Sequence, residues 1–210
     1  MNIAYHTGLH LGDNSLPTWV EEPYADVLVL TGGVYSNQQT KDQLLKLISK
    51  WSKVFLVPSV DEYPLLDSQD NLTVLNREFV IYNGVRFIGA TLWPHPPTIL
   101  DPEYLKIKGF NKHDQRFSSG QDRDFIRSQT NLYADATVVI TAYSPSKLNS
   151  TIGSNLDYVL EEGPNLTWIC GGDTTKTLYL GKSTLLTNYY GFKRYGDFNA
   201  YHKKDSVCIV

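Results

Sequence analysis

Five polar or glycine-rich segments follow short apolar runs, and they hold the side chains best suited to chemistry. These segments are 7–10, 31–33, 58–62, 141–143 and 171–174. Within them, His10, Asp61 and Asp173 are candidate ligands for a divalent cation, because such ions take imidazole nitrogen and carboxylate oxygen. Glu62 could join the two aspartates in a carboxylate site for magnesium or calcium. We favour the alternative, in which His10 makes hydrogen bonds within its loop and the acids are solvated.

Three other features carry weaker chemical signals. Cys170 ends an apolar run, where a free cysteine is commonly buried, and no base lies near it in the sequence. His95 and His113 have a spacing that matches no metal motif. The run from Gly181 to Thr184 is superficially like a phosphate-binding loop, but Lys176 stands where that motif needs glycine. We therefore assign no catalytic residue to these positions.

The apolar runs before the five segments predict the strands that position them. Residues 26–30, 54–57 and 137–141 are continuous apolar or β-branched runs, as expected for strands buried on both faces. Residues 38–51 carry an apolar stripe at helical spacing, so a strand, helix, strand unit with parallel strands is expected. Ligands of such sheets bind at the carboxyl ends of the strands, where the five segments lie.

The rest of the chain predicts a second group of strands and two further helices. Asn83-Gly84 is a hairpin signal between strands at 79–82 and 85–92. Residues 93–120 are expected to form a long loop or partial cap, followed by a helix over 121–133. The remaining expected elements are a strand at 72–75, a helix at 154–160, a strand at 166–170 and a hairpin of strands 177–180 and 184–188.

Composition excludes several classes of protein. The 210 residues fit one domain, and a net charge of -3 does not resemble the basic surface of a nucleic-acid binder. No apolar run reaches transmembrane length, and the N-terminus does not read as a secretion signal. Two cysteines do not support a disulfide framework or a four-cysteine zinc site. We expect no nucleic-acid or membrane partner, and a cytoplasmic or virion-associated location.

These runs and loops, in this order, resemble the calcineurin-like metallophosphoesterases. Residues 25–32 resemble the family's ADVLVLAGD strand, and 168–171 resemble the strand before its GHTH motif. The stretch 84–93 is similar to one in a small bacterial and phage subgroup. The resemblance covers residues 1–192. It implies an α/β fold with a metallophosphoesterase-like two-sheet β-sandwich core flanked by helices, leaving 193–210 as a tail that packs on the domain or contacts a partner.

The family's metal-binding motifs are degenerate in this chain. Asp-x-His reads Gly8-Leu9-His10, the aspartate of Gly-Asp is Gly33, and Asn-His-Glu reads Val60-Asp61-Glu62. The histidine after the fourth strand falls at Ala142 or Tyr143, and Gly-His-x-His reads 171–174. The degenerate positions are Gly8, His10, Gly33, Val60, Asp61, Ala142, Tyr143, Gly172, Asp173 and Thr174. The two divalent metals of the family are therefore not expected, because two close cations need carboxylates around them.

The resemblance and the losses together predict a pseudoenzyme with a binding or assembly role. A protein partner is expected, and the subgroup points to a phage-encoded or virion-associated component. Two alternatives stay open: a phosphoesterase with a rebuilt single-metal site using His10, Asp61 and Asp173, or a small-ligand receptor in the old cleft. A phosphate is expected to be repelled there unless Lys147 or Lys176 reaches in.

Overall fold

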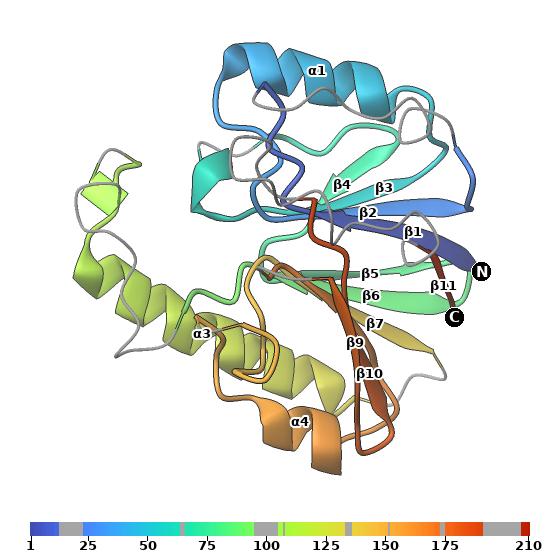
Figure 1. The fold of residues 1–210 in the computed structure, drawn as a ribbon, viewed down its shortest axis with the longest axis vertical. Coiled ribbons are helices and arrows are strands. Elements are labelled where there is room, and N and C mark those ends of the chain that lie inside the picture. The colour runs from blue at the N-terminus through green and yellow to red at the C-terminus, as the bar shows by residue number, and fades with distance from the viewer. Residues whose placement is uncertain are drawn as a thin grey trace.

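The fold is an α/β arrangement of two sheets with helices on their outer faces (Figure 1). The computed structural model describes residues 1–12, 23–63, 66–94, 105–106, 108–132, 136–150, 152–172, 175–190 and 207–210. The expectation of an α/β fold built on two sheets is confirmed. In the described part of the chain, no helix has the length and apolar character needed to cross a membrane.

The first sheet has five strands in the order β11-β1-β2-β3-β4. Its strands are β1 (Asn2–Thr7), β2 (Val27–Thr31), β3 (Val54–Val57), β4 (Leu72–Val74) and β11 (Val207–Ile209). Strands β1 to β4 are parallel, and β11 is antiparallel to β1, with Ile3 opposite Cys208. The end of the predicted tail therefore forms the edge of this sheet.

The second sheet has six strands in the order β5-β6-β7-β8-β10-β9. Its strands are β5 (Glu78–Tyr82), β6 (Val85–Ala90), β7 (Thr137–Thr141), β8 (Thr167–Cys170), β9 (Lys176–Leu180) and β10 (Ser183–Thr187). The β5–β6 and β9–β10 pairs are the two predicted antiparallel hairpins. Asn83 and Gly84 both have positive φ in the first turn, as a tight hairpin requires.

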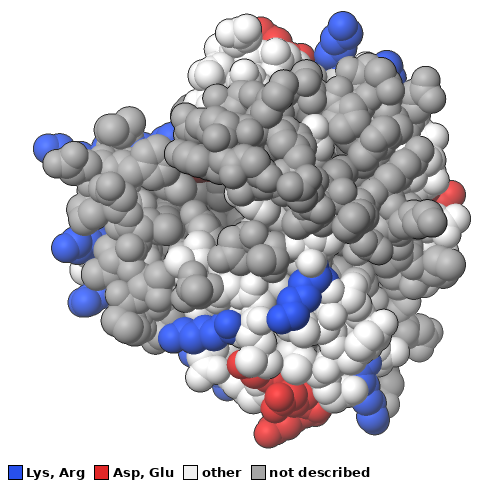
Figure 2. All heavy atoms as spheres, in the orientation of Figure 1, with Lys and Arg blue, Asp and Glu red and all other residues white. Residues whose placement is uncertain are grey.

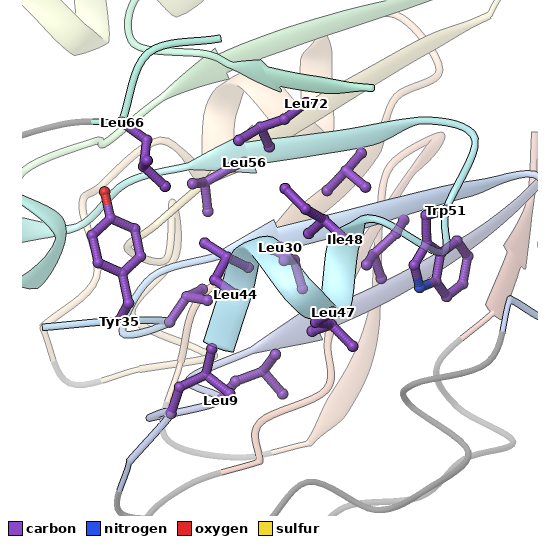
Figure 3. Packing of buried hydrophobic residues seen from close by; sticks show 14 of the residues in the cluster. Leu9, Leu30, Tyr35, Leu44, Leu47, Ile48, Trp51, Leu56, Leu66 and Leu72 are labelled. Carbon is purple, nitrogen blue, oxygen red and sulfur yellow. The ribbon is translucent and has the colours of Figure 1, made fainter. Parts of the chain in front are cut away.

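Alternate residues of the central strands pack in different layers. In β2, Val27 and Val29 face the other sheet, whereas Leu28 and Leu30 face α1 (Gln38–Ile48). Figure 3 shows Leu44, Leu47 and Ile48 of α1 over the outer face of the first sheet. Helices α3 (Lys112–Thr130) and α4 (Asp157–Glu162) lie beside the outer face of the second sheet (Figure 1), where Ile126, Val159 and Leu160 join its core cluster.

Two helices begin at other residues than predicted, and α1 ends at Ile48, three residues before its predicted end. Helix α3 begins at Lys112, nine positions before the expected start, because Asn111 caps it: its side chain accepts from the amides of His113 and Asp114, and Asp114 accepts from the amide of Asn111. The long loop expected over 93–120 is therefore helical from residue 112. Helix α4 begins at Asp157, three residues after its predicted start.

Candidate functional site

The predicted loops come together around one pocket of about 310 Å³. It lies where β1, β2 and β3 of the first sheet and β7 and β8 of the second end. From the first sheet, its wall includes Gly8, His10, Gly33 and Asp61; from the second, it includes Ala142, Tyr143 and Gly172. The loops that the sequence singled out therefore meet at one place, and both sheets contribute to it.

The remaining predicted positions do not line the described pocket wall. Val60 is buried against Trp93 in a small apolar cluster. His113 is exposed on the first turn of α3. Asp173, Thr174 and His95 lie outside the described residues.

Two glycines of the pocket wall, Gly8 and Gly33, leave little room for side chains. Gly8 and Gly33 have φ of +60° and +62°, the left-handed region that favours glycine. A Cβ on Gly8 would lie 2.5 Å from Cε2 of Tyr189, and a Cβ on Gly33 would lie 2.6 Å from Cε1 of His10. The rings of His10 and Tyr189 therefore occupy the space into which side chains at these positions would project.

His10 is held in this place by the backbone around it. Its amide donates to the carbonyl of Gly33 at 2.7 Å, and its own φ of 44° turns the chain back toward β2. The rings of His10 and Tyr189 meet edge to face, with centroids 6.5 Å apart. Tyr189 is fixed in turn by a bridge to Thr7, at the end of β1. The two rings form one aromatic wall.

Tyr189 is one of the pocket residues that sequence reasoning missed. It comes from the segment after β10, and only the long-range bridge to Thr7 brings it to β1. Ser144, Ser150 and Ile152 also line the pocket from the loop after β7. Nothing in the local pattern of that loop marked them.

Glu62 is a structural carboxylate, so its expected place among solvated loop acids was wrong. It is fully buried, and its oxygens accept hydrogen bonds from the amide of Ser59 at 2.8 Å, from the Ser59 hydroxyl at 2.6 Å and from the amide of Val34. Burial raises the pKa of Glu62, nearby Asp61 raises it further, and the hydrogen bonds from Ser59 and Val34 oppose that rise. Glu62 therefore ties the loop after β3 to the loop after β2.

Asp61 is the carboxylate of this loop that does line the pocket. Lys108 donates from Nζ to the backbone carbonyl of Asp61 at 2.6 Å. Near Lys108 in the chain, Phe110 packs against Tyr63 and Trp93. The centroid of its ring lies 4.8 Å from that of Tyr63 and 4.9 Å from that of Trp93. The segment before α3 is thereby fastened to the loop that carries Asp61.

Most backbone donors at the pocket are already engaged. The amide of Gly8 donates to the carbonyl of Gly32 at 2.9 Å, and the amide of Gly32 donates to the carbonyl of Val57 at 3.2 Å. The amide of Gly33 donates to the Ser59 hydroxyl at 3.2 Å. These glycine turns therefore do not present the row of free amides that makes an anion-binding nest.

The second sheet shows the same engagement. The amide of Gly171 donates to the carbonyl of Thr141 at 2.9 Å. A Cβ on Gly171 would stand 1.9 Å from the carbonyl oxygen of Ala142, so this glycine is required for the strand ends to meet.

Cys170 lies beneath the pocket and is not an activated nucleophile. Its side chain is fully buried, and Asn149 Nδ2 lies 3.5 Å from its Sγ. Burial raises the pKa of the Cys170 thiol far above its ordinary value, so the thiolate is disfavoured. The geometry agrees with the absence of a base near Cys170 in the sequence.

The described residues do not fit a pair of divalent metals. Among the described residues, no group of three or more His, Cys, Asp or Glu side chains is arranged to hold a metal ion. Gly8 and Gly33 supply no side-chain ligand, and the rings of Tyr189 and His10 lie in the space beside them. We therefore derive no chemical step through bound metals.

Charged side chains are spread over the described part of one face of the molecule. On the face shown in Figure 2, the described Lys and Arg side chains stand at several separate places, and Asp and Glu side chains gather at the lower end. A nucleic-acid binder usually carries its basic residues in one patch or stripe. The described part of this face carries its basic residues dispersed instead.

Comparison with known proteins supports the fold and no more. No family model matches the chain, and no curated protein matches it by sequence. The crystal structure of the phosphopantetheinyl hydrolase PptH from Mycobacterium tuberculosis is similar with a TM-score of 0.65 and 11% identity, covering 100% of this chain and 95% of PptH. A second solved structure has a TM-score of 0.57 and 15% identity, over 92% of this chain and 91% of its own.

Proposed function

We propose that this protein is a non-hydrolytic, metallophosphoesterase-like binding protein that holds a small organic ligand in the pocket. The observation that carries the proposal is that the rings of Tyr189 and His10 fill the space beside Gly8 and Gly33, the two positions where the resembled family has metal-binding aspartates. A pocket of about 310 Å³ remains at the strand ends. Its size is at the lower end of ordinary ligand sites, about 300 to 1,000 Å³.

The loss of carboxylates argues against two-metal hydrolysis. Two cations close enough to bridge one phosphate repel each other strongly unless anionic ligands surround them. In the described pocket wall, Asp61 is the carboxylate-bearing residue and His10 the imidazole. These two side chains fall short of the donor set that two cations need.

The pocket also disfavours a phosphate-bearing ligand. The described wall contains neither Lys nor Arg, and the amides of Gly8, Gly32, Gly33 and Gly171 already donate within the protein. Lys176, one of the two lysines that the sequence analysis named as able to reach a phosphate in the pocket, donates instead to the carbonyl of Leu148 at 3.1 Å. The carboxylate of Asp61 would repel a phosphate further.

The side chains that do face the pocket suit a ring or an ammonium group without phosphate. His10, Tyr143 and Tyr189 contribute three aromatic rings to the wall. Aromatic faces bind flat rings by stacking and bind organic cations through the ring quadrupole. The proposed ligand class is therefore a small neutral or cationic organic molecule.

Matched ligand pairs test this proposal. Each pair has one phosphorylated member: adenosine and AMP, choline and phosphocholine, and pantetheine and 4′-phosphopantetheine. The last pair is included because the structurally similar PptH is a phosphopantetheinyl hydrolase. We expect thermal stabilisation by at least one unphosphorylated member and a smaller shift with its phosphorylated partner. Stronger stabilisation by the phosphorylated members, or no response across the panel, would count against the ligand class.

A variant and a metal assay complete the test. Tyr143→Ala should weaken binding of the stabilising ligand about tenfold by removing one ring of the wall. Tyr179→Ala, on an exposed residue of β9 outside the pocket wall, is the matched control. Elemental analysis should find no stoichiometric manganese, zinc or iron, and phosphoesters should stay intact with manganese present. Stoichiometric metal with hydrolysis would favour the rebuilt single-metal enzyme.

A further inference from the structure

The second sheet has an edge strand, β5, with an uncovered apolar face. All five residues of β5 are at least partly exposed, with Phe79 at 49% and Ile81 at 66% exposure. On its other face, Val80 and Tyr82 pack against the core between the sheets. Because β5 ends the sheet order, part of its backbone has no strand neighbour within the described fold.

The sequence of β5 lacks the devices that usually protect such an edge. Natural edge strands are commonly short, bulged or interrupted by Lys or Pro. Strand β5 reads Glu-Phe-Val-Ile-Tyr, with its only charge at its first residue. Two other edges, β4 and β11, have three residues each, and the fourth edge, β9, begins with an exposed Lys176. Edge β5 is therefore the one best suited to accept another strand.

The exposed side chains of β5 are also held in place. The guanidinium carbon of Arg86 lies 4.5 Å from the centroid of the Phe79 ring, and Arg86 itself is buried. Arg86 is fixed in turn by donating from Nη1 to the carbonyl of Gln129 at 3.1 Å. Phe79 thus loses less side-chain freedom on binding than a loose surface ring would.

We infer that β5 pairs with β5 of a second copy of this chain across a two-fold axis at Val80. In this antiparallel register, Phe79 of each copy lies opposite Ile81 of the other copy. Glu78 of each copy lies opposite Tyr82 of the other copy. Directly opposite residues share a face of the sheet, so the four exposed apolar side chains would form one cluster. No like charges face each other within the paired strands. The two six-stranded sheets become one continuous sheet.

The pairing is expected to be weak. Aromatic and β-branched cross-strand pairs each contribute only modestly, and a single five-residue strand pair is smaller than the interface of a permanent dimer. A self-complementary contact between identical patches closes at two copies. The inference concerns a surface away from the pocket and does not rest on the proposed function.

Sedimentation velocity of the full chain over a range of concentrations tests the inference. We expect a monomer–dimer equilibrium with a dimer appearing at concentrations on the order of 100 µM. Ile81→Lys should weaken the dimer at least about tenfold, because it places an ammonium group opposite Phe79. Tyr179→Lys, a comparably exposed change on the other edge β9, should leave the dimer unchanged. Circular dichroism of each variant verifies that it is folded.

Charge pairing tests the register itself. Phe79→Glu and Ile81→Lys chains should each remain monomeric alone. Their mixture should regain a dimer, because the register places the new carboxylate of one chain opposite the new ammonium group of the other. A wild-type chain that stays monomeric at every concentration overturns the inference. So does a dimer that is insensitive to Ile81→Lys, a mixture that shows no recovery, or an open series of larger species.

Discussion

Replacing Gly33 with alanine measures whether the His10 ring fills the space beside Gly33. The new Cβ would lie 2.6 Å from Cε1 of His10, whereas carbon atoms in contact prefer about 3.5–4.0 Å. The ring must therefore move by about 1 Å, and overpacking of this kind costs about 1–3 kcal/mol. The backbone φ of +62° adds about 1–2 kcal/mol for any residue with a Cβ. The total expected loss of stability is about 2–5 kcal/mol.

Gly84→Ala supplies the matched control for the backbone cost. Gly84 has a similar φ of +78°, but a Cβ there would meet nothing within 4 Å. It should therefore lose only the left-handed cost of about 1–2 kcal/mol. The difference between the two variants isolates the contact with His10.

A double-mutant cycle assigns that contact to the His10 ring. His10→Asn introduces a residue type that tolerates positive φ and removes the ring, so Gly33→Ala in this background should cost about 1–3 kcal/mol less. The measurement is equilibrium unfolding in urea for all four chains, with the m-value verified to be unchanged. The reasoning fails if Gly33→Ala is no more destabilising than Gly84→Ala, or if its cost is the same in the His10→Asn background.

Three further predictions test the framework around the pocket. His6 is buried, and its pKa is lowered to about 3. As pH falls below about 6.5, this histidine therefore takes up a proton in the unfolded chain before it does so in the folded chain, and the free energy of unfolding decreases. His6→Gln should remove about 2 kcal/mol of the stability lost between about pH 7 and about pH 5, measured by urea unfolding at both pH values. Glu62→Gln should cost about 2–4 kcal/mol in the same assay by converting one buried acceptor into a donor, while exposed Glu78→Gln should cost almost nothing. Gly171→Ala should lower stability by more than about 3 kcal/mol in thermal melts, because its Cβ meets the backbone oxygen of Ala142, which no rotamer change can move. A loss of stability as small as that of Gly84→Ala would refute this prediction.

The strands were predictable because their residue types indicate that they are buried. Strands β2, β3 and β7 are continuous apolar or β-branched runs and are buried along their whole length. Parallel strands that end on one side bring their following loops together, so the place of the pocket followed from the order of the runs. Both hairpins were also predictable, since Asn83 and Gly84 adopt the conformation that their types favour.

The missed features depend on polar contacts or on distant segments. Helix α3 starts with a polar turn whose capping box at Asn111 and Asp114 outweighs the weak apolar pattern. A similar signal was readable at Ser59 and Glu62, which form a capping box at η2 (Val60–Glu62) and explain why Glu62 is buried. The position of Tyr189 could not be predicted, because it depends on a bridge between segments far apart in the chain.

The two rings determine what a side chain added at Gly8 or Gly33 would meet. If Gly8 and Gly33 lay against open space, an aspartate at each position could extend its carboxylate into that space. Instead Tyr189 and His10 stand 2.5 Å and 2.6 Å from the places of the new Cβ atoms. A carboxylate would have to displace a ring that the backbone holds by a strand bridge or a 2.7 Å hydrogen bond. The glycines and the rings are therefore one arrangement, and the aromatic wall that leaves no room for side chains at these two positions is the same wall that we propose holds the ligand.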